Sequence, residues 1–401
     1  AVARASGRAR GAAARLAPLS PARGGWETPV AEDPFEVPLA DKLALLVQTT
    51  AILQREPAVR VAAGSLHAWE ERKTFASSEG ARVAQRIVHT GGGIVATAVD
   101  AHDLQVRSYP NSFGGQYESA GFELVRRLDL PGHAAETAAM AAALLTADPC
   151  PARETTVILD GSQVSLQIHE SCGHPAELDR ALGHEANFAG TSFLTPDQLG
   201  RLRYGSPVVN LVADATTPRG LGTFGFDDEG VPAQRADLVR AGVFTGYLTS
   251  RETAARLGQA SNGAMRAAGW RELPLIRMTN VNLEPGEWPL EQLIADTDDG
   301  IHMLTNRSWS IDDRRYNFQF GTEVGWEIRH GRRTRLLKNC TYAGITPAFW
   351  GACDAVGDAR DWEIWGTPNC GKGQPAQSMR TAQGAASARF RHVSVGMGYG
   401  R

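Results

Sequence analysis

Residues 155–183, TTVILDGSQVSLQIHESCGHPAELDRALG, are the most informative stretch of the chain. The β-branched run TTVILD (155–160) is typical of a strand, and Gly161 marks its end. The residues that follow, IHESCGHPAELDRALG (168–183), predict a helix that carries two histidines and a glutamate. We therefore expect the chemistry of this protein on a helix that directly follows a strand.

The residues before this stretch predict a mixed α/β part. Leucines and valines recur at helical spacing in residues 38–56, which predicts a helix. Residues 59–100 change to a β pattern, and the run GGG at 91–93 lies between two strand candidates, where it favours a turn. Residues 116–147 predict two short helices separated by LPG at 130–132.

The residues after it are rich in β and turn signals. Segments such as SPVVNLVAD, GVFTGYLTS and GTEVGWEIRHGRRTRLL alternate with glycine, proline and asparagine, and a helical pattern is weak except near residues 251–260. The whole chain therefore predicts an α+β fold, with a mixed α/β N-terminal part and a mostly antiparallel β C-terminal domain that carries the helix with the histidines.

Composition shifts divide the chain into three segments. Residues 1–37 are rich in arginine and alanine, with five arginines and no acid before Glu27. This resembles a transit peptide, but we favour an exposed helix end followed by a linker. A mixed α/β domain is expected at residues 38–150, and the catalytic domain at residues 151–401, because Pro151 interrupts the pattern between them.

The composition also excludes several classes of function. The formal net charge is −3 over 401 residues, so nucleic acid is not indicated as a partner. The most apolar segment, residues 134–147, is too short to span a bilayer, so no membrane partner is expected. The five cysteines are odd in number and scattered, which argues against a disulfide framework. They indicate a reducing compartment, and we expect a cytoplasmic protein.

His169, Glu170 and His174 form a candidate catalytic metal site. A hydrolytic zinc site needs neutral imidazole ligands, an open position for water and a carboxylate that accepts the water's proton. The pattern His-Glu-x-x-His on a helix supplies these groups. Glu177, three residues beyond His174, could accept a hydrogen bond from that imidazole and orient it, or it could be an ordinary exposed carboxylate.

The two histidines lie five residues apart rather than four. On a regular helix this spacing separates them by about 140°, which is poor geometry for sharing one ion. Pro175 cannot donate a hydrogen bond to the Ser171 carbonyl, and Gly173 loosens the same turn. The sequence therefore predicts a π-type bulge, kink or helix end between Ser171 and Pro175 that returns His174 to the side of His169.

A third ligand must come from elsewhere, because two histidines do not hold a catalytic zinc tightly. The candidates are Cys172, His184, Glu185 and Cys370. Cys370 lies in WGTPNCGKGQPAQ (365–377), where the prolines and glycines predict an exposed, rigid loop. Such a loop is a poor place for a merely structural cysteine, and Lys372 would favour the thiolate. Spacing alone leaves these candidates open.

Six segments between about residues 169 and 378 carry a further signal: HESCGHPAELDR, FDDEGVPAQ, MTNVNLEPG, FGTEVGWEI, TYAGITPAFW and WGTPNCGKGQPAQ. In combination they resemble the TldD/PmbA family of zinc metallopeptidases, specifically its TldD-type catalytic subunit. Weaker similarity reaches back through the first half of the chain. Family members usually carry a further β-containing segment at the N-terminus, so we expect residues 38–150 to be incomplete at their start.

The resemblance implies an enzyme with a His-Glu-x-x-x-His motif. It implies that Zn²⁺ is held by His169, His174 and Cys370, that Glu170 is the catalytic residue and that no organic cofactor is bound. It also implies a dimer with a related PmbA/TldE-type subunit, and an enclosed site that admits unfolded or extended peptides. The donor that stabilises the oxyanion stays open, with three candidates: Tyr204, Arg219 and Lys372.

Two other functions compete with this reading. In the first, Cys370 or Cys172 is the nucleophile of a metal-free cysteine hydrolase, which leaves Glu170 and one histidine without a role. In the second, the chain is a non-catalytic subunit of a peptidase assembly, although such a subunit is expected to lack the metal motif.

Overall fold

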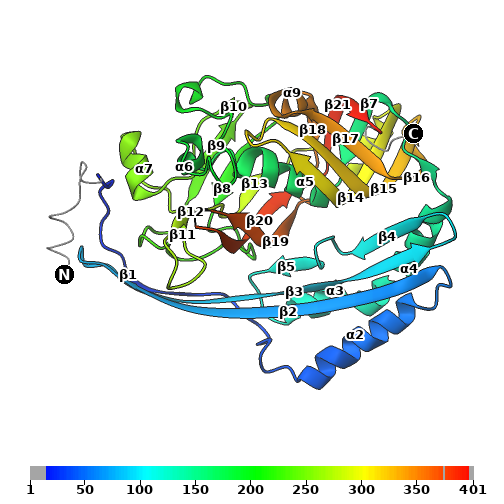
Figure 1. Ribbon diagram of the computed structural model, residues 1–401, viewed down its shortest axis with the longest axis horizontal. Helices are drawn as coiled ribbons and strands as arrows, with labels where there is room; N and C mark the ends of the chain where they lie inside the picture. Colours follow the sequence, from blue (N-terminus) through cyan, green and yellow to red (C-terminus); the bar gives the residue numbers. More distant parts are fainter. Residues whose placement is uncertain (1–14, 374, 397–401) are drawn as a thin grey trace.

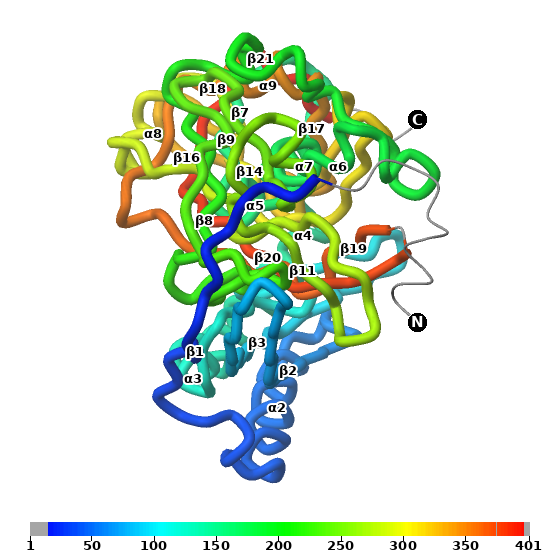
Figure 2. The backbone as a smooth tube through the Cα atoms, turned by 90° about the vertical axis from the view of Figure 1, so that its left-hand side faces the viewer, coloured from blue at the N-terminus to red at the C-terminus, as the bar shows by residue number. Residues whose placement is uncertain are grey.

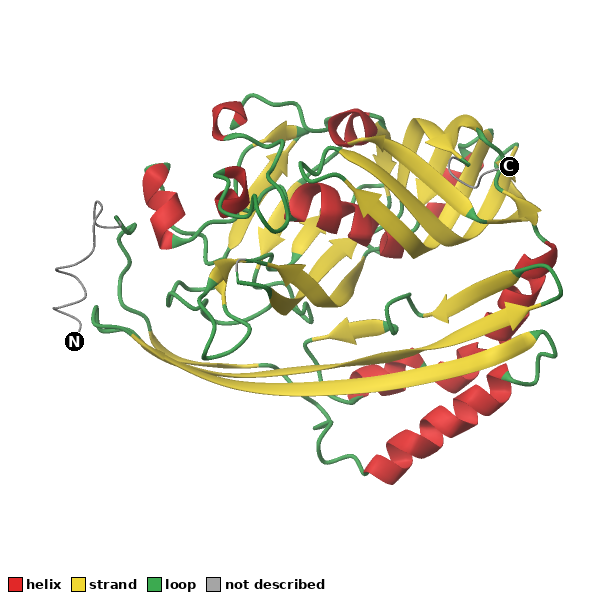
Figure 3. Ribbon diagram, viewed as in Figure 1, coloured by secondary structure: helices red, strands yellow, loops and turns green. Residues whose placement is uncertain are grey.

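Two parts of different architecture make up the computed structural model, which describes residues 15–373 and 375–396 (Figure 1). The first part is a long curved sheet with helices, and the second is a larger β-rich part that lies above it in this view. Strands predominate over helices, and most of the sheets are antiparallel (Figure 3). The predicted α+β class is confirmed.

The first part is built on one long hairpin. Strands β2 (Val59–Ala76) and β3 (Arg82–Val99) pair antiparallel along nearly their whole length. Three shorter strands pair with β3: β1 (Arg23–Glu27) in parallel, and β4 (Leu104–Tyr109) and β5 (Gln116–Glu118) antiparallel. Strand β1 lies in the segment expected to be a linker, whereas the arginine-rich residues 1–14 lie outside the described residues.

Three helices pack on this sheet: α2 (Leu39–Leu53), α3 (Glu123–Leu128) and α4 (Leu130–Thr146). The helix predicted at residues 38–56 is confirmed, and two helices lie within 116–147 as predicted, although that range begins with strand β5 and α4 is not short. The break between α3 and α4 falls at Asp129, which adopts a left-handed conformation with φ of 43°. Residues 130–132, which we expected to separate the helices, instead begin α4, because Pro131 fits the first turn of a helix.

The glycine run at 91–93 does not form a turn, so that prediction was wrong. All three glycines lie inside β3. A Cβ atom on Gly93 would lie 2.5 Å from Gly115 Cα and 2.7 Å from the Tyr109 carbonyl oxygen. The backbone between β4 and β5 crosses β3 so closely that only glycine fits there.

The second part is organised around a sheet of eight strands. Its members are β6 (Asp148–Pro149), β7 (Arg153–Leu159), β14 (Asp299–Ile311), β15 (Asn317–Arg329), β16 (Arg332–Lys338), β17 (Cys340–Ile345), β18 (Cys353–Val356) and β21 (Ala388–Val395). Five of them pair in a closed ring, in the order β14, β7, β21, β17, β15 and back to β14. Only the β7–β14 contact in this ring is parallel.

Smaller elements surround this sheet. The strands are β8 (Leu211–Asp214), β9 (Arg235–Arg240), β10 (Val243–Phe244), β11 (Met265–Arg266), β12 (Leu275–Ile276), β13 (Val281–Leu283), β19 (Glu363–Lys372) and β20 (Gln377–Ala385). The helices are α5 (Gly161–Ile168), α6 (Leu178–Ala181), α7 (Arg251–Arg256), α8 (Leu290–Ala295) and α9 (Thr346–Gly351), with a short 3₁₀ turn at Pro196–Gln198. Strands β19 and β20 form a separate antiparallel hairpin.

The first residues of the described chain connect the two parts. The segment before β1 runs along the second part before it reaches the long sheet (Figure 2). The backbone N–H of Ala17 donates to the Arg251 carbonyl at 2.8 Å, and the Arg251 guanidinium donates back to the Ala17 carbonyl. None of the helices in the described part of the chain combines the length and the apolar character needed to cross a bilayer.

Candidate metal centre

The helix that carries the histidines follows β7 directly, as predicted. Asp160 caps α5, because its carboxylate accepts hydrogen bonds from the backbone N–H of Gln163 at 2.9 Å and from the Ser162 hydroxyl. All residues of α5 are buried, and the helix lies between β14 and the β19–β20 hairpin (Figure 1). The strand and its cap thus fix where the helix begins.

The helix changes to a π-helical turn at His169–Gly173. The backbone N–H of His174 donates to the His169 carbonyl at 3.1 Å, five residues back rather than four. This turn absorbs one residue and places His174 beside His169, as the spacing of the two histidines required. The predicted irregularity in the helix is confirmed.

Two features stabilise the irregular turn. Pro175 offers no N–H to the Ser171 carbonyl, and the Tyr204 hydroxyl donates to that carbonyl instead, at 2.9 Å. Gly173 packs against Met278 so closely that a Cβ at this position would lie 2.1 Å from the Met278 sulfur. Tyr204, which we considered as an oxyanion donor, is fully buried and has this structural role.

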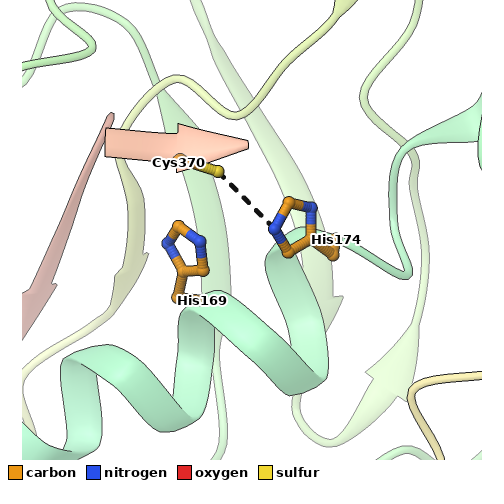
Figure 4. A group of neighbouring side chains, drawn as sticks. All are labelled: His169, His174 and Cys370. Atoms are coloured by element: carbon orange, nitrogen blue, oxygen red, sulfur yellow. Dashed lines mark hydrogen bonds between the residues drawn. The ribbon is translucent and has the colours of Figure 1, made fainter. Parts of the chain in front are cut away.

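His169, His174 and Cys370 present their donor atoms to one point. One ligand atom from each lies within 4.8 Å of the others, and all three side chains are buried. The imidazole rings stand nearly perpendicular, at 88°, and Figure 4 shows them turned toward the Cys370 sulfur. The Cys370 sulfur lies 3.5 Å from His174 Nε2. Two such ligands on one tetrahedral zinc would be separated by about 3.6 Å, so the spacing fits that ion.

Cys370 does not lie in an exposed loop, and that prediction was wrong. It is 4% exposed on strand β19, where it pairs with Met379 of β20 next to an irregularity in the register. The prolines and glycines that suggested a loop are accommodated by this irregularity and by the end of the hairpin. The Arg277 guanidinium donates to the Cys370 carbonyl at 2.6 Å and helps to hold the strand.

The charges around Cys370 favour a thiolate. Burial alone would raise the pKa of this thiol, but His169, Arg277 and His174 hold the pKa well below its usual value. Burial keeps the pKa of His174 far below normal, so its imidazole is neutral. Burial also opposes protonation of His169, although the Cys370 thiolate raises the pKa of His169 above normal. A metal cation would displace that proton, so these donors suit a cation of the zinc type.

Glu177 lies where it can orient His174. Its Oε2 atom is 3.1 Å from His174 Nδ1, which leaves Nε2 free to face Cys370. Lys372, two residues after Cys370, is fully buried and places its ammonium 3.4 Å from the same Glu177 oxygen. The ammonium also donates to both Asp179 oxygens, at 2.8 and 2.9 Å. Lys372 therefore joins the hairpin to the histidine segment and is not an oxyanion donor.

A cavity of about 280 Å³ opens onto the three donors. Glu170 lines it beside them, and the Glu170 carboxylate is paired with the Arg315 guanidinium. Phe113 and Trp309 also line the cavity, with their rings edge to face at 5.2 Å and each partly exposed. The remaining lining residues are Leu166, Thr367, Asn369 and Gly371. Arg219, a third oxyanion candidate, is absent from this lining and pairs with Glu118 instead.

The other candidate ligands lie away from this point. Cys172 belongs to the apolar core, and burial raises the pKa of its thiol to about 12. His184 is exposed, and Glu185 accepts a hydrogen bond from the Gly373 backbone at 3.2 Å. The sequence reading missed Arg315, which lies 145 residues from Glu170 in the chain; its only local signal is the DDRRYN turn at 312–317.

Comparison with known proteins agrees with a metallopeptidase. The PmbA/TldA metallopeptidase central domain matches residues 32–145, and the C-terminal domain of the same family matches residues 152–397. The chain therefore belongs to the PmbA/TldD metallopeptidase family, as its resemblance suggested. A metalloprotease of Methanocaldococcus jannaschii is 30% identical over 89% of this chain and 74% of its own length.

Solved structures share the fold. A Thermotoga maritima protein, described as a modulator of a DNA gyrase, superposes with a TM-score of 0.73 at 19% identity, over 92% of this chain and 76% of that one. TldE of Thermococcus kodakarensis superposes with a TM-score of 0.64 at 16% identity, over 88% and 74% of the two chains. At these identities the likeness concerns the fold alone.

Proposed function

We propose that this chain is a zinc-dependent peptidase whose metal is held by His169, His174 and Cys370 and whose catalytic base is Glu170. The observation that supports it most is the convergence of two imidazoles and one cysteine sulfur on a buried point that opens into a cavity. Two neutral ligands and one thiolate would leave a net charge near +1 at Zn²⁺, with a coordination position open to the cavity.

The chain's own residues divide the chemistry between them. A zinc ion at this site would supply a Lewis acid and lower the pKa of water toward about 7. Glu170 takes the proton of the attacking water and returns it to the leaving amine. Glu177 accepts from His174 Nδ1 and holds that ring with Nε2 toward Cys370.

The size of the cavity supports a peptide substrate. A space of about 280 Å³ holds a few side chains of an extended peptide, but not a folded domain. We propose unfolded or extended peptides as substrates and a related PmbA/TldE-type subunit as the partner, in a cytoplasmic complex. We further propose that residues 38–150 and 151–401 are its two domains.

The test combines metal analysis with one substitution. The purified protein should contain about one zinc per chain, and a chelator should abolish peptide cleavage. Glu170→Gln should retain zinc but lose about 10²-fold or more in kcat, because the general base is removed. Cleavage that survives complete removal of zinc would overturn the proposal. If iodoacetamide also blocked this zinc-free cleavage, a cysteine hydrolase would replace it, since the Cys370–His174 pair could serve that chemistry.

A further inference from the structure

We propose that Arg315 is the oxyanion-stabilising residue of this site, and that its guanidinium passes from Glu170 to the oxyanion as the peptide bond is attacked. This inference rests on the proposed peptidase function. It starts from a contact that the sequence motif did not reveal, the ion pair between Arg315 and the proposed base.

The backbone around Arg315 is held firmly. Arg315 lies in the connection between β14 and β15 with φ of 63°, a conformation that non-glycine residues rarely adopt. Its N–H donates to the Asp312 carbonyl at 2.9 Å, and its own carbonyl accepts from the Thr346 hydroxyl at 2.9 Å. None of these bonds involves the Arg315 side chain. The turn thus aims the side chain at the cavity, and the strain is of a kind found at functional sites.

The Arg315 guanidinium has donors to spare. A guanidinium carries five N–H donors, and the Arg315 Nη1 atom uses one of them for Glu170. The Arg315 Nε atom is buried and has no hydrogen-bond partner among the described residues. The cavity lining includes no other arginine and no lysine within the described part of the chain. Among the described residues, Arg315 is therefore the only permanently cationic side chain that lines this cavity, and it would act beside the metal.

The movement of charge in the reaction explains why this cation lies beside the base. As the water oxygen forms a bond to the carbonyl carbon, the water's proton passes to Glu170. The electron pair of the C=O bond moves to the carbonyl oxygen. The negative charge thus leaves Glu170 and develops on the substrate oxygen, within the same cavity. The Arg315 guanidinium, held between Glu170 and the substrate oxygen, loses the Glu170 carboxylate as a partner when it gains the oxyanion. In a cavity that excludes much of the water, such an ionic contact is strong.

The experiment uses three variants in the full chain. Arg315→Gln removes the positive charge and the planar guanidinium with its several N–H donors, whereas Arg315→Lys keeps the charge. Arg314→Gln makes the same charge change on the neighbouring exposed arginine. Each variant is measured for zinc content, for kcat and KM on an unstructured peptide, and for binding of two analogues of that peptide. One analogue has a phosphinic group at the scissile bond, which mimics the oxyanion. The other has a methylene there and presents no oxygen.

We expect Arg315→Gln to keep its zinc and its KM while kcat falls about 10²–10³-fold, the range for loss of one oxyanion donor. Binding of the phosphinic peptide should weaken by a similar factor, whereas binding of the methylene peptide should not change. Arg315→Lys should recover part of both losses, and Arg314→Gln should match the wild type.

Unchanged binding of the phosphinic peptide by Arg315→Gln would overturn the inference. Equal weakening of both analogues would also overturn it, since Arg315 would then anchor the substrate rather than its oxyanion. Failure of the proposed peptidase function can be distinguished from failure of this inference. It would appear in proteins that retain Arg315, either as absent zinc or as full activity of Glu170→Gln. Calorimetry with the analogues requires no turnover, so it measures binding separately from cleavage.

Discussion

The proposed metal ligands come from two segments that are held in different ways. His169 and His174 lie in one irregular turn, whose shape is supported by the hydrogen bond from the Tyr204 hydroxyl and by packing against Met278. Cys370 lies 196 residues from His174 along the chain and reaches the same point on a strand. That strand is held by charged groups, with Arg277 on the Cys370 carbonyl and Lys372 on Asp179 and Glu177.

The difference shows that one metal centre can depend on two kinds of support. The histidine turn depends on shape, because a methyl group or a lost hydroxyl would disturb it. The cysteine strand depends on buried charge, because Lys372 has no exposed surface and its partners are carboxylates. Loss of a metal ligand should therefore reduce zinc occupancy equally in both segments. Loss of a residue that supports the turn or the strand should affect the two segments differently.

Substitution of a ligand should have the largest effect. We expect alanine at His169, His174 or Cys370 to reduce zinc occupancy steeply and to abolish cleavage, since two donors do not retain a catalytic zinc. Metal content per chain, measured by mass spectrometry, checks this. His184→Ala is the matched control, because His184 is exposed and should leave zinc unchanged. Full zinc occupancy in Cys370→Ala would show that Cys370 is not a metal ligand.

Lys372→Met should have the next largest effect. It leaves the Asp179 carboxylate buried without its cation, which costs about 3–5 kcal/mol of unfolding free energy. Zinc affinity should also fall about 10- to 100-fold, because Lys372 supports Glu177 behind His174. Urea unfolding and zinc titration measure the two effects. Arg235→Met, which breaks an exposed pair with Glu284, should cost less than about 1 kcal/mol. Similar losses in both variants would contradict the buried role of Lys372.

Two glycines allow a direct comparison of the segments. Gly173→Ala places a methyl group 2.1 Å from the Met278 sulfur and should destabilise the protein by about 1–3 kcal/mol. Gly371→Ala, on the cysteine strand, meets nothing within 4 Å and should leave the melting temperature nearly unchanged. Equal melting temperatures for the two variants would show that the histidine turn can relax around the added methyl group.

Tyr204→Phe should have the smallest effect. It removes the hydroxyl that donates to the Ser171 carbonyl where Pro175 cannot, at a cost of about 1 kcal/mol. A small fall in melting temperature with zinc retained is expected. A variant that loses its zinc would mean that this single hydrogen bond maintains the π-helical turn.

The parts of the site that could be predicted are those that depend on residues close together in the sequence. The five-residue spacing of His169 and His174, with Pro175 after them, predicted the irregular turn, because backbone geometry leaves few ways to place both rings on one ion. The surroundings of Cys370 could not be predicted in this way. Proline and glycine near it are as typical of an irregular strand as of a loop, and only the pairing with β20 decides between them.

Long-range contacts account for the other failures. Arg315 meets Glu170 only because the connection between β14 and β15 reaches the π-helical turn, and neither residue has a local pattern that indicates the other. The glycine run at 91–93 likewise suits a turn until the backbone at residues 109–115 is known to cross it. The overall α+β class depends on the periodicity of apolar and polar residues within each segment, and this periodicity can be read from the sequence alone.

The wall of the cavity has a consequence for how this protein could diversify. Phe113 comes from the first part of the molecule and meets Trp309 of the second at the edge of the cavity, whereas the proposed ligands and base all come from the second part. One residue of the cavity wall is thus encoded in a stretch of the gene separate from the reactive groups. Mutations around residue 113 can alter which molecules enter while the reactive groups stay untouched, so substrate range and catalytic competence are free to evolve at different rates.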